Sequence, residues 1–270
     1  MGKLVDSVIS KIDAVNPIHV KKLRKHIKDA DSEYFKKAED FLAKYVEILV
    51  SIDKDLDYGV HCYLKMCSDM MYEHVRFSES GKYSNTSFDD VNTKVYGNPE
   101  IMTYYMYGLL LSQFLWRHHY EILKFFTNSL GKYKKDVRNY LEIGGGHGLY
   151  ISEASNIFGK DVKYDFIDIS SSSIEIAKKF IGVGRVNYIL EDIFKFNNGH
   201  QYDFITMGEV LEHMESPQDL LSRVRDMLTD KGHLFITTPT NAPTIDHIYL
   251  FRNIQEIKDI IERSGLNVVE

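Results

Sequence analysis

The stretch that decides the fold of this chain lies near its middle and reads Leu141-Glu142-Ile143-Gly144-Gly145-Gly146-His147-Gly148. Apolar residues typical of a strand lead directly into glycines, and an amphipathic segment over 149–158 follows. Glycines permit a tight turn and a close approach of the backbone to a ligand, and the start of the next helix presents unpaired N–H groups. The stretch therefore predicts a strand, a turn that binds a nucleotide-like ligand, and a helix, although a turn without a ligand can also be rich in glycine.

Downstream of this stretch, short β-rich runs alternate with amphipathic segments. We expect strands at 140–143, 164–167, 187–190, 204–207 and 234–237, and helices at 149–158, 173–180 and 217–228. Such alternation is typical of βαβ units around a parallel sheet. The sequence therefore predicts an α/β fold of the Rossmann-like, doubly wound type with a mostly parallel sheet.

Upstream of the glycine stretch, the apolar residues recur at helical spacing. They do so over 35–49, after a plausible N-cap at Asp31, again over 60–75, and in a third run over 101–126 that follows Asn98-Pro99. A charged run over 132–138 marks the junction between this helical region and the alternating strands and helices that follow. We therefore expect an all-helical cap region at 1–132 and a ligand-binding domain at 133–270.

Three carboxylates are expected at the ends of neighbouring strands, where a doubly wound sheet binds its ligand. Asp168 follows Gly148 by 20 residues, a spacing that suits hydrogen bonds to ribose hydroxyls, although it could also cap the helix near Ser170. Asp192 closes the third strand. Glu142 would repel a pyrophosphate and attract a sulfonium or ammonium group. The charge pattern therefore favours S-adenosylmethionine over a dinucleotide.

Residues 139–270 resemble the class I S-adenosylmethionine-dependent methyltransferases, in particular those that act on small molecules and ubiquinone precursors. The matching segments are the ExGxGxG motif at 142–148, the acidic end of the second strand at 166–170, the loop at 191–193, the fourth strand with its Leu-Glu-His turn at 202–213, and the turn and fifth strand at 228–239. Asp230-Lys231 stands where this family commonly has proline and glycine.

The resemblance implies a set of donor-binding residues that line one pocket: Glu142, Gly144, Gly145, Gly146, Asp168, Ile169, Asp192, Ile193 and Glu209. In this family the residues at the first strand and its glycine turn hold the methionine end of the donor. Asp168 would hold the ribose, Ile169 would pack on the adenine, and Asp192 with the Ile193 backbone would bind the adenine amino group. Glu209 would lie under the donor near the substrate entrance.

Transfer of a methyl group from a sulfonium depends mainly on proximity and alignment, so a catalytic base is optional. Histidines are the candidates because their ordinary pKa suits proton transfer near neutrality. We expect His213, His247 and His119 in this role, although His213 could equally have a structural one. Tyr107 is expected to contact the donor from the underside of the helical cap, with a place in the helical core as the alternative.

Composition limits the possible partners. The net charge is −6, and no block of lysine or arginine suggests a nucleic-acid track. No apolar run reaches the roughly 18 residues of a membrane span, and the N-terminal segment does not resemble a secretory signal. The two cysteines, Cys62 and Cys67, suit neither a disulfide framework nor a metal site. We therefore expect a cytoplasmic protein with no nucleic acid, no membrane and no bound metal.

One departure from the family concerns the end of the sheet. The family has a sixth and an antiparallel seventh strand, whereas residues 266–270 account only for the sixth. A missing strand would leave an exposed edge, a liability unless another chain or the helical region covers it. We therefore regard a homodimer as possible.

Three functions remain open at this level. The first is methyl transfer from S-adenosylmethionine to a small-molecule acceptor, with an oxygen nucleophile expected. A large cap suits a small substrate that must be sequestered from water, whereas a macromolecule needs an open face. The second is a Rossmann-fold oxidoreductase that uses NAD. The third is a binding or partner protein that keeps the donor fold without catalysis.

Overall fold

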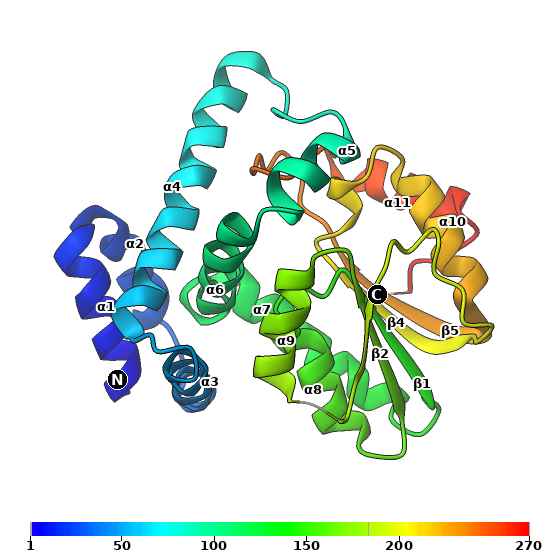
Figure 1. The fold of residues 1–270 in the computed structure, drawn as a ribbon, viewed down its shortest axis with the longest axis horizontal. Helices are drawn as coiled ribbons and strands as arrows, with labels where there is room; N and C mark the ends of the chain where they lie inside the picture. The colour runs from blue at the N-terminus through cyan, green and yellow to red at the C-terminus, as the bar shows by residue number, and fades with distance from the viewer. Residues whose placement is uncertain (1, 183, 270) are drawn as a thin grey trace.

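The computed structural model describes residues 2–182 and 184–269, which form a parallel sheet flanked by helices and joined to a helical N-terminal half (Figure 1). The helical half contains α1 (Lys3–Val15), α2 (Pro17–Lys28), α3 (Ser32–Val50), α4 (Leu56–Ser80), α5 (Phe88–Val91), the π-helix η1 (Asn92–Tyr96), α6 (Pro99–Leu115) and α7 (Arg117–Tyr133). The second half contains β1 (Asn139–Ile143), α8 (Leu149–Phe158), β2 (Lys163–Asp168), α9 (Ser171–Ile181), β3 (Asn187–Leu190), β4 (Tyr202–Gly208), the 3-10 turn η2 (Leu211–His213), α10 (Pro217–Met227), β5 (Leu228–Thr237) and α11 (Ile254–Arg263).

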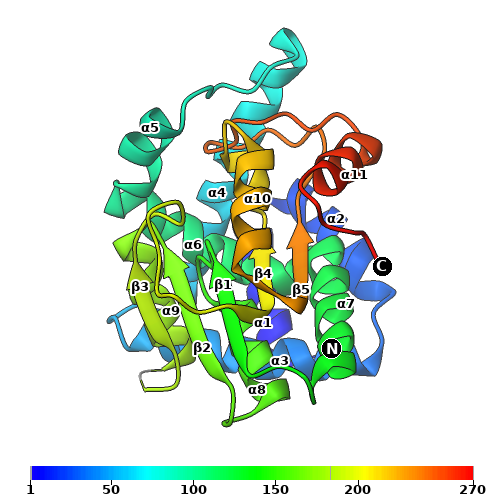
Figure 2. The ribbon, with the colours of Figure 1, turned by 90° about the vertical axis from the view of Figure 1, so that its right-hand side faces the viewer.

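The sheet has the strand order β3-β2-β1-β4-β5, and all four pairings are parallel (Figure 2). In the register, Leu141 of the central strand lies opposite Asp165 on β2 and Ile205 on β4. The carboxyl ends of the strands therefore meet at one edge of the sheet. The expected Rossmann-like fold is confirmed, with each of the five strands predicted between residues 140 and 237 present.

Both faces of the sheet are buried because side chains alternate along each strand. Tyr140 and Phe204 belong to the apolar cluster on the α8 and α9 face, and their rings lie within about 6 Å of Phe158 on α8. Leu141 and Ile205 point the other way, into the cluster that contains the buried side chains of α10. This alternation fixes which strand residues can reach a ligand beyond the strand ends.

The N-terminal helices share one apolar core with the α8 and α9 face of the sheet. The α6 helix packs against α9, and α7 packs against α8. Phe41 of α3 contacts Phe180 of α9 with ring centroids 6.0 Å apart. The helical region is thus built into the core of the sheet domain.

The predicted helix over 101–126 is two helices, because the chain is extended at Trp116 (φ −104°, ψ 124°). The indole N–H of Trp116 donates to the Tyr63 hydroxyl of α4 at 2.7 Å. The predicted N-cap at Asp31 is confirmed, since its side chain accepts a backbone N–H bond at the start of α3, and Asn98 caps α6 in the same way.

The expected sixth strand is wrong, because the described residues 266–269 form no strand. Gly265 takes a left-handed conformation (φ 79°) after α11, and Leu266 packs into the cluster beneath α10. Val269 is then 74% exposed. In the part of the chain that the structure describes, β5 therefore has a strand neighbour only on the β4 side, and no helix there is long and apolar enough to cross a membrane.

The close contact of α4 and α6 gives a test of the helical packing. A Cβ added at Gly108 would lie 2.9 Å from the carbonyl oxygen of Cys62 and 3.1 Å from Cα of Tyr63. Because backbone must move to admit it, we expect Gly108→Ala to lower the free energy of unfolding by about 1–3 kcal/mol in urea denaturation. Gly131→Ala is the matched control on α7, where no described atom lies within 4 Å of the new methyl group. That change should be neutral or raise stability by up to about 1 kcal/mol. Equal stability of the two variants would contradict the packing.

Candidate functional site

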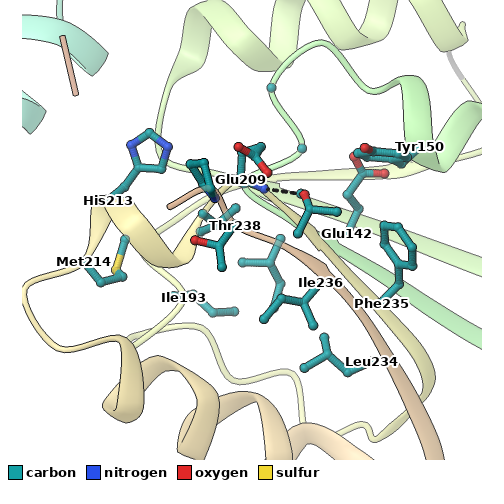
Figure 3. A pocket seen from close by; sticks show the side chains of 18 of the residues that line it. Glu142, Tyr150, Ile193, Glu209, His213, Met214, Leu234, Phe235, Ile236 and Thr238 are labelled. Atoms are coloured by element: carbon teal, nitrogen blue, oxygen red, sulfur yellow. Dashed lines mark hydrogen bonds between the residues drawn. The ribbon is translucent and has the colours of Figure 1, made fainter. Parts of the chain in front are cut away.

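A cavity of about 1670 Å³ opens at the carboxyl ends of β1, β2, β4 and β5. Ligand pockets usually measure about 300–1,000 Å³, so this cavity has room for more than one small molecule. Helices α6 and α7 line one side of it, and the loops that follow β4 and β5 line another. Figure 3 shows Glu142 and Tyr150 toward one end, His213 and Met214 toward the other, and Glu209 between them.

The glycine turn after β1 has the geometry that its sequence predicts. Gly144 and Gly146 take left-handed conformations (φ 62° and 53°), which other residues adopt only with strain. A Cβ at Gly144 would also lie 2.9 Å from a methyl group of Val210. The turn ends at Gly148, which precedes the first residue of α8. All three glycines from Gly144 to Gly146 line the cavity.

Glu142 is a buried carboxylate at the cavity wall, only 1% exposed. Among the described residues, neither of its oxygens has a hydrogen-bond partner of good geometry. Burial raises the pKa of Glu142 well above its ordinary value and nearby Asp168 adds to the rise, although the Ile151 backbone N–H opposes it. A buried carboxylate without a partner is costly, and a cationic group of a ligand would relieve that cost. The residue therefore fits the methionine end of a sulfonium donor.

Asp168 ties the end of β2 to the glycine turn. One of its oxygens accepts from the Gly146 N–H at 3.0 Å, and the other accepts from the Ser170 N–H at 2.8 Å. Burial raises the pKa of Asp168 to about 6, against the lowering effect of these bonds. Ser170, rather than Asp168, is the N-cap of α9, because its hydroxyl accepts from the Ser173 N–H. Asp168 still lines the cavity and keeps lone pairs for a ligand.

The predicted adenine-side residues lie around the same cavity. Ile169, Asp192 and Ile193 all line it. Asp192 accepts from the Phe194 N–H at 2.9 Å, which fixes the loop after β3. The structure thus brings the three expected carboxylates of Glu142, Asp168 and Asp192 to one cavity.

Glu209 lines the cavity at the end of β4 and has an unusual backbone. Its φ of 54° is left-handed, a strained state for a residue with a side chain. Its N–H donates to the Thr237 carbonyl at 3.0 Å and lies 3.1 Å from the Thr237 hydroxyl oxygen (Figure 3). The neighbouring strand therefore holds this strained conformation in place, a feature that clusters at functional sites.

Two of the three predicted histidines come together at the cavity wall. The rings of His213 and His247 are 5.0 Å apart and perpendicular. Both also lie beside Glu212, whose Oε1 is 3.7 Å from the Nε2 of each ring. The hydroxyl of Tyr96 is 2.7 Å from Nδ1 of His213, and Asp246 adds a carbonyl oxygen at 3.1 Å.

His119 lies apart from this pair, on α7. Its Nδ1 is 2.9 Å from the Ser112 hydroxyl, and the residue lines the cavity near the glycine turn, where His147 acts on it electrostatically. Burial lowers the pKa of His119 to about 3. The sequence placed the three histidines in one catalytic role, whereas the structure divides them between two parts of the cavity.

Tyr107 requires a correction, because its side chain lies within the helical core. Its ring packs 6.3 Å from Tyr45 and 6.2 Å from Tyr58, and its carbonyl accepts from the Tyr45 hydroxyl. Tyrosines at helical spacing satisfy a core as well as a pocket, so spacing alone could not distinguish the two. Met102, Tyr105 and Met106 are the α6 residues near it that line the cavity.

The sequence also left two residues of the site without a role, Glu212 and Tyr96. Glu212 stands directly before His213 in the Leu-Glu-His turn, which was a usable signal. Asp246, expected to influence the tautomer of His247 only if the fold brings the two together, instead has its carbonyl oxygen 3.1 Å from Nδ1 of His213. Tyr96 reaches the site from η1, and no local pattern indicates that it contacts a residue 117 positions away.

The fold and site together define a Rossmann-like domain built to bind a nucleoside ligand beside carboxylates, at the carboxyl end of a parallel sheet. Residues 115–270 match the family described as a methyltransferase domain. Since the match covers more than half of the chain, this protein belongs to that family. The family uses S-adenosylmethionine as its methyl donor, so the resemblance seen in the sequence is confirmed, and methyl transfer is favoured over the NAD-dependent alternative.

Curated relatives include two O-methyltransferases. The chain is 29% identical over 142 residues to malonyl-[acyl-carrier protein] O-methyltransferase 2 of Ilyobacter polytropus, covering 47% of this chain and 54% of that protein. It is 32% identical over 106 residues to the mitochondrial ubiquinone biosynthesis O-methyltransferase of Schizosaccharomyces pombe, covering 37% and 38%. The chain thus spans about half or less of the length of these relatives.

Solved structures share the fold over most of the chain. A putative O-methyltransferase from Nostoc punctiforme aligns with a TM-score of 0.57 at 15% identity, covering 78% of this chain and 67% of that one. The mitomycin 7-O-methyltransferase aligns with a TM-score of 0.55 at 12% identity, covering 78% and 64%. These alignments include helical residues before β1, so they extend the common fold beyond the sheet.

The raised pKa of Asp168 predicts how binding of S-adenosylhomocysteine depends on pH. Protonation of the free protein near pH 6 removes a carboxylate that we expect to accept ribose hydrogen bonds. Affinity should therefore fall as the pH falls from about 7 to 5, by up to roughly tenfold per pH unit below 6.

Calorimetric titration across this range measures the effect, and Asp168→Asn separates it from the titration of Glu142 and Glu209, whose pKa values are also raised. The variant should bind S-adenosylhomocysteine more weakly near neutral pH, and its affinity should no longer change near pH 6. An unchanged step in the variant would show that another group causes it.

Proposed function

We propose that this chain transfers the methyl group of S-adenosylmethionine to an oxygen nucleophile of a small molecule. The observation that carries the proposal is Glu142, a buried carboxylate with no hydrogen-bond partner in the described chain, beside a left-handed glycine turn. A donor with sulfonium and ammonium groups supplies the charge that this position needs. Membership of the methyltransferase-domain family supports the same donor.

The donor-binding roles follow from the positions around the cavity. Glu142 and the turn from Gly144 to Gly146 hold the methionine end. Asp168 holds the ribose, and Ile169 with the loop at Asp192 and Ile193 surrounds the adenine. We place Glu209 beside the reacting methyl group, because it lies between Glu142 and His213 (Figure 3).

The acceptor occupies the part of the cavity under the N-terminal helices. Its walls are rich in aromatic and methionine side chains: Tyr96, Met102, Tyr105, Met106, Leu109 and Trp116. These helices share their core with the sheet and form one wall of the cavity, and this apolar wall suits a small molecule with an apolar or aromatic body. The O-methyltransferase names of the two curated relatives support oxygen as the nucleophile.

Alignment is the main contribution of the protein to the reaction. The acceptor oxygen forms a bond to the methyl carbon, the carbon–sulfur bond breaks, and its electron pair stays on sulfur. Burial lowers the pKa values of His119 and His247 to about 3, so both are weak bases near neutral pH. Of the three predicted histidines, we place His213 at the acceptor end of the cavity.

We further propose that the chain forms a homodimer along β5 and works in the cytoplasm. In the described residues β5 is an edge strand, and an open edge attracts a second strand. Cys62 and Cys67 are both free thiols, as a reducing compartment allows. Light scattering on the purified chain measures its oligomeric state, and a monomer at all concentrations would exclude the dimer.

Thermal melting and turnover together test the proposed function. S-adenosylhomocysteine at about 100 times its dissociation constant should stabilise the chain by roughly 2.7 kcal/mol, a shift of several degrees, while NAD should give none. With methyl-labelled donor, small phenols and catechols should be methylated, and matched aromatic amines should not. A chain that binds S-adenosylhomocysteine but methylates no acceptor would instead be a binding protein. Transfer of the labelled methyl group to the aromatic amines would exclude oxygen as the specific nucleophile.

A further inference from the structure

One side-chain cluster at the cavity wall lies outside the donor-binding residues. Glu212 and His213 belong to η2, which follows β4, and His247 belongs to the loop after β5. One ligand-type atom from each, namely Oε1 of Glu212 and a ring nitrogen of each histidine, lies within 4.8 Å of the other two. Two loops of the sheet thus bring three possible metal ligands to one point.

One carboxylate oxygen of Glu212 accepts a hydrogen bond, and the other has no hydrogen-bond partner among the described residues. Oε2 accepts from the Thr238 hydroxyl at 2.8 Å. Oε1 is fully buried, and the described chain offers it no hydrogen-bond donor. The nearest ring nitrogens, the Nε2 atoms of His213 and His247, are both 3.7 Å away, which is too long for a hydrogen bond. Such a buried acceptor is costly unless something positive approaches it.

The surroundings of the two rings indicate where their protons lie. Nδ1 of His247 is 2.6 Å from the Ala242 carbonyl oxygen, and Nδ1 of His213 is 3.1 Å from the Asp246 carbonyl oxygen. A carbonyl can only accept, so the contact of His247 favours a proton on its Nδ1 and leaves a lone pair on Nε2. Nδ1 of His213 lies closer to the Tyr96 hydroxyl, at 2.7 Å, and a hydroxyl can accept from the same N–H. With Nδ1 of both rings protonated, two nitrogen lone pairs and one carboxylate oxygen converge.

We propose that Glu212, His213 and His247 bind a divalent first-row transition-metal cation such as Zn²⁺ or Co²⁺. Two neutral imidazoles with one carboxylate are a common ligand set for such ions, whereas Mg²⁺ prefers oxygen ligands alone. Ligand atoms at about 2.0–2.2 Å from a tetrahedral ion are roughly 3.3–3.6 Å apart, so the two 3.7 Å separations need only a small adjustment.

The second layer of contacts is of the kind that metal-binding histidines use. Metal-bound imidazoles usually donate their other N–H to a carbonyl or carboxylate, which orients the ring. His247 does so to Ala242, and His213 does so to Asp246, whose carboxylate is also 3.5 Å from the same nitrogen. The carboxylates of Glu209 and Asp246 add negative charge around the cluster, because both act electrostatically on Glu212. This arrangement replaces the sequence-based expectation of no metal.

The open coordination positions of the ion face the cavity, since His213 and His247 both line it. An acceptor hydroxyl that completes the coordination loses its proton to cavity water more readily, because a bound cation lowers the pKa of its oxygen ligand. The oxygen then attacks the methyl carbon while the sulfur keeps the electron pair of the broken bond. This role rests on the proposed function, whereas metal binding itself does not.

Direct titration of the whole chain tests the inference. The chain is treated with a chelator, dialysed and titrated with Co²⁺ under visible absorption and with Zn²⁺ and Mg²⁺ by calorimetry. We expect one Co²⁺ per chain with a visible absorption band, displacement by Zn²⁺, and at least about 100-fold weaker binding of Mg²⁺. Failure of both Co²⁺ and Zn²⁺ to bind stoichiometrically would overturn the site without any variant.

Matched glutamine substitutions locate the ion. His247→Gln and Glu212→Gln should each weaken Co²⁺ binding by more than about 100-fold, beyond the 10–100-fold typical of outer-layer partners. His200→Gln, at an exposed histidine in the loop after β3, should leave it unchanged. Wild-type affinity in both cluster variants would refute the assignment. Binding of S-adenosylhomocysteine shows whether each variant is folded. In the wild type the same measurement tests the proposed donor site independently of metal binding, so failure of one proposal can be distinguished from failure of the other.

Discussion

The hydrogen bonds that Asp168 accepts from Gly146 and Ser170 hold the site together. They join the left-handed turn after β1 to the start of α9, although the two lie in different βαβ units. Without that link, the glycine turn would lose its defined shape, since glycine has the greatest freedom to lose on folding. The same carboxylate is then only partly available to a ligand, so it stabilises the fold and shapes the binding site together. Removal of this side chain therefore affects the free protein as well as the complex.

Two buried carboxylates mark the functional ends of the cavity. Glu142 and Glu212 both lie below 2% exposure and both keep oxygens without a hydrogen-bond partner in the described structure. Burial raises the pKa of each, which shows that neither position stabilises a negative charge by itself. A fold tolerates such cost at positions that bind something positive. In the proposed reaction complex, the donor cation would satisfy Glu142 and the metal ion would satisfy Glu212.

The sequence predicted the sheet well because its signals are local. The β-rich runs of β1 and β4 and the glycines of the turn after β1 act over a few residues, and the structure has the strands, buried along most of their length, and a positive φ at Gly144. The break at Trp116 could not be predicted in the same way, because it depends on a hydrogen bond to Tyr63 on another helix. Likewise, helical spacing predicts which residues share one face of a helix but not what that face packs against. The sequence therefore could not predict that Tyr107 lies in the helical core and not at the cavity. Glu212 and His247 are 35 positions apart and come together only because two loops meet in the fold. The sequence alone therefore showed only that Glu212 and His213 are adjacent.

The cover of the cavity is held by two kinds of contact, and they differ in the cost of opening. Helices α6 and α7 are fixed by apolar burial, with side chains such as Leu111 and Phe126 fully inside the common core. The segment from Asn85 to Tyr96 buries only Val91 and Val95 in that core and is also held by polar contacts, including Asn85 to the Ile245 carbonyl and Tyr96 to His213. Water can replace such bonds at a net cost of about 1 kcal/mol each, whereas exposing a fully buried aromatic side chain costs about 1.5–3 kcal/mol. Because the α5 and η1 segment buries fewer apolar side chains than α6 and α7, local opening costs less there than along those two helices.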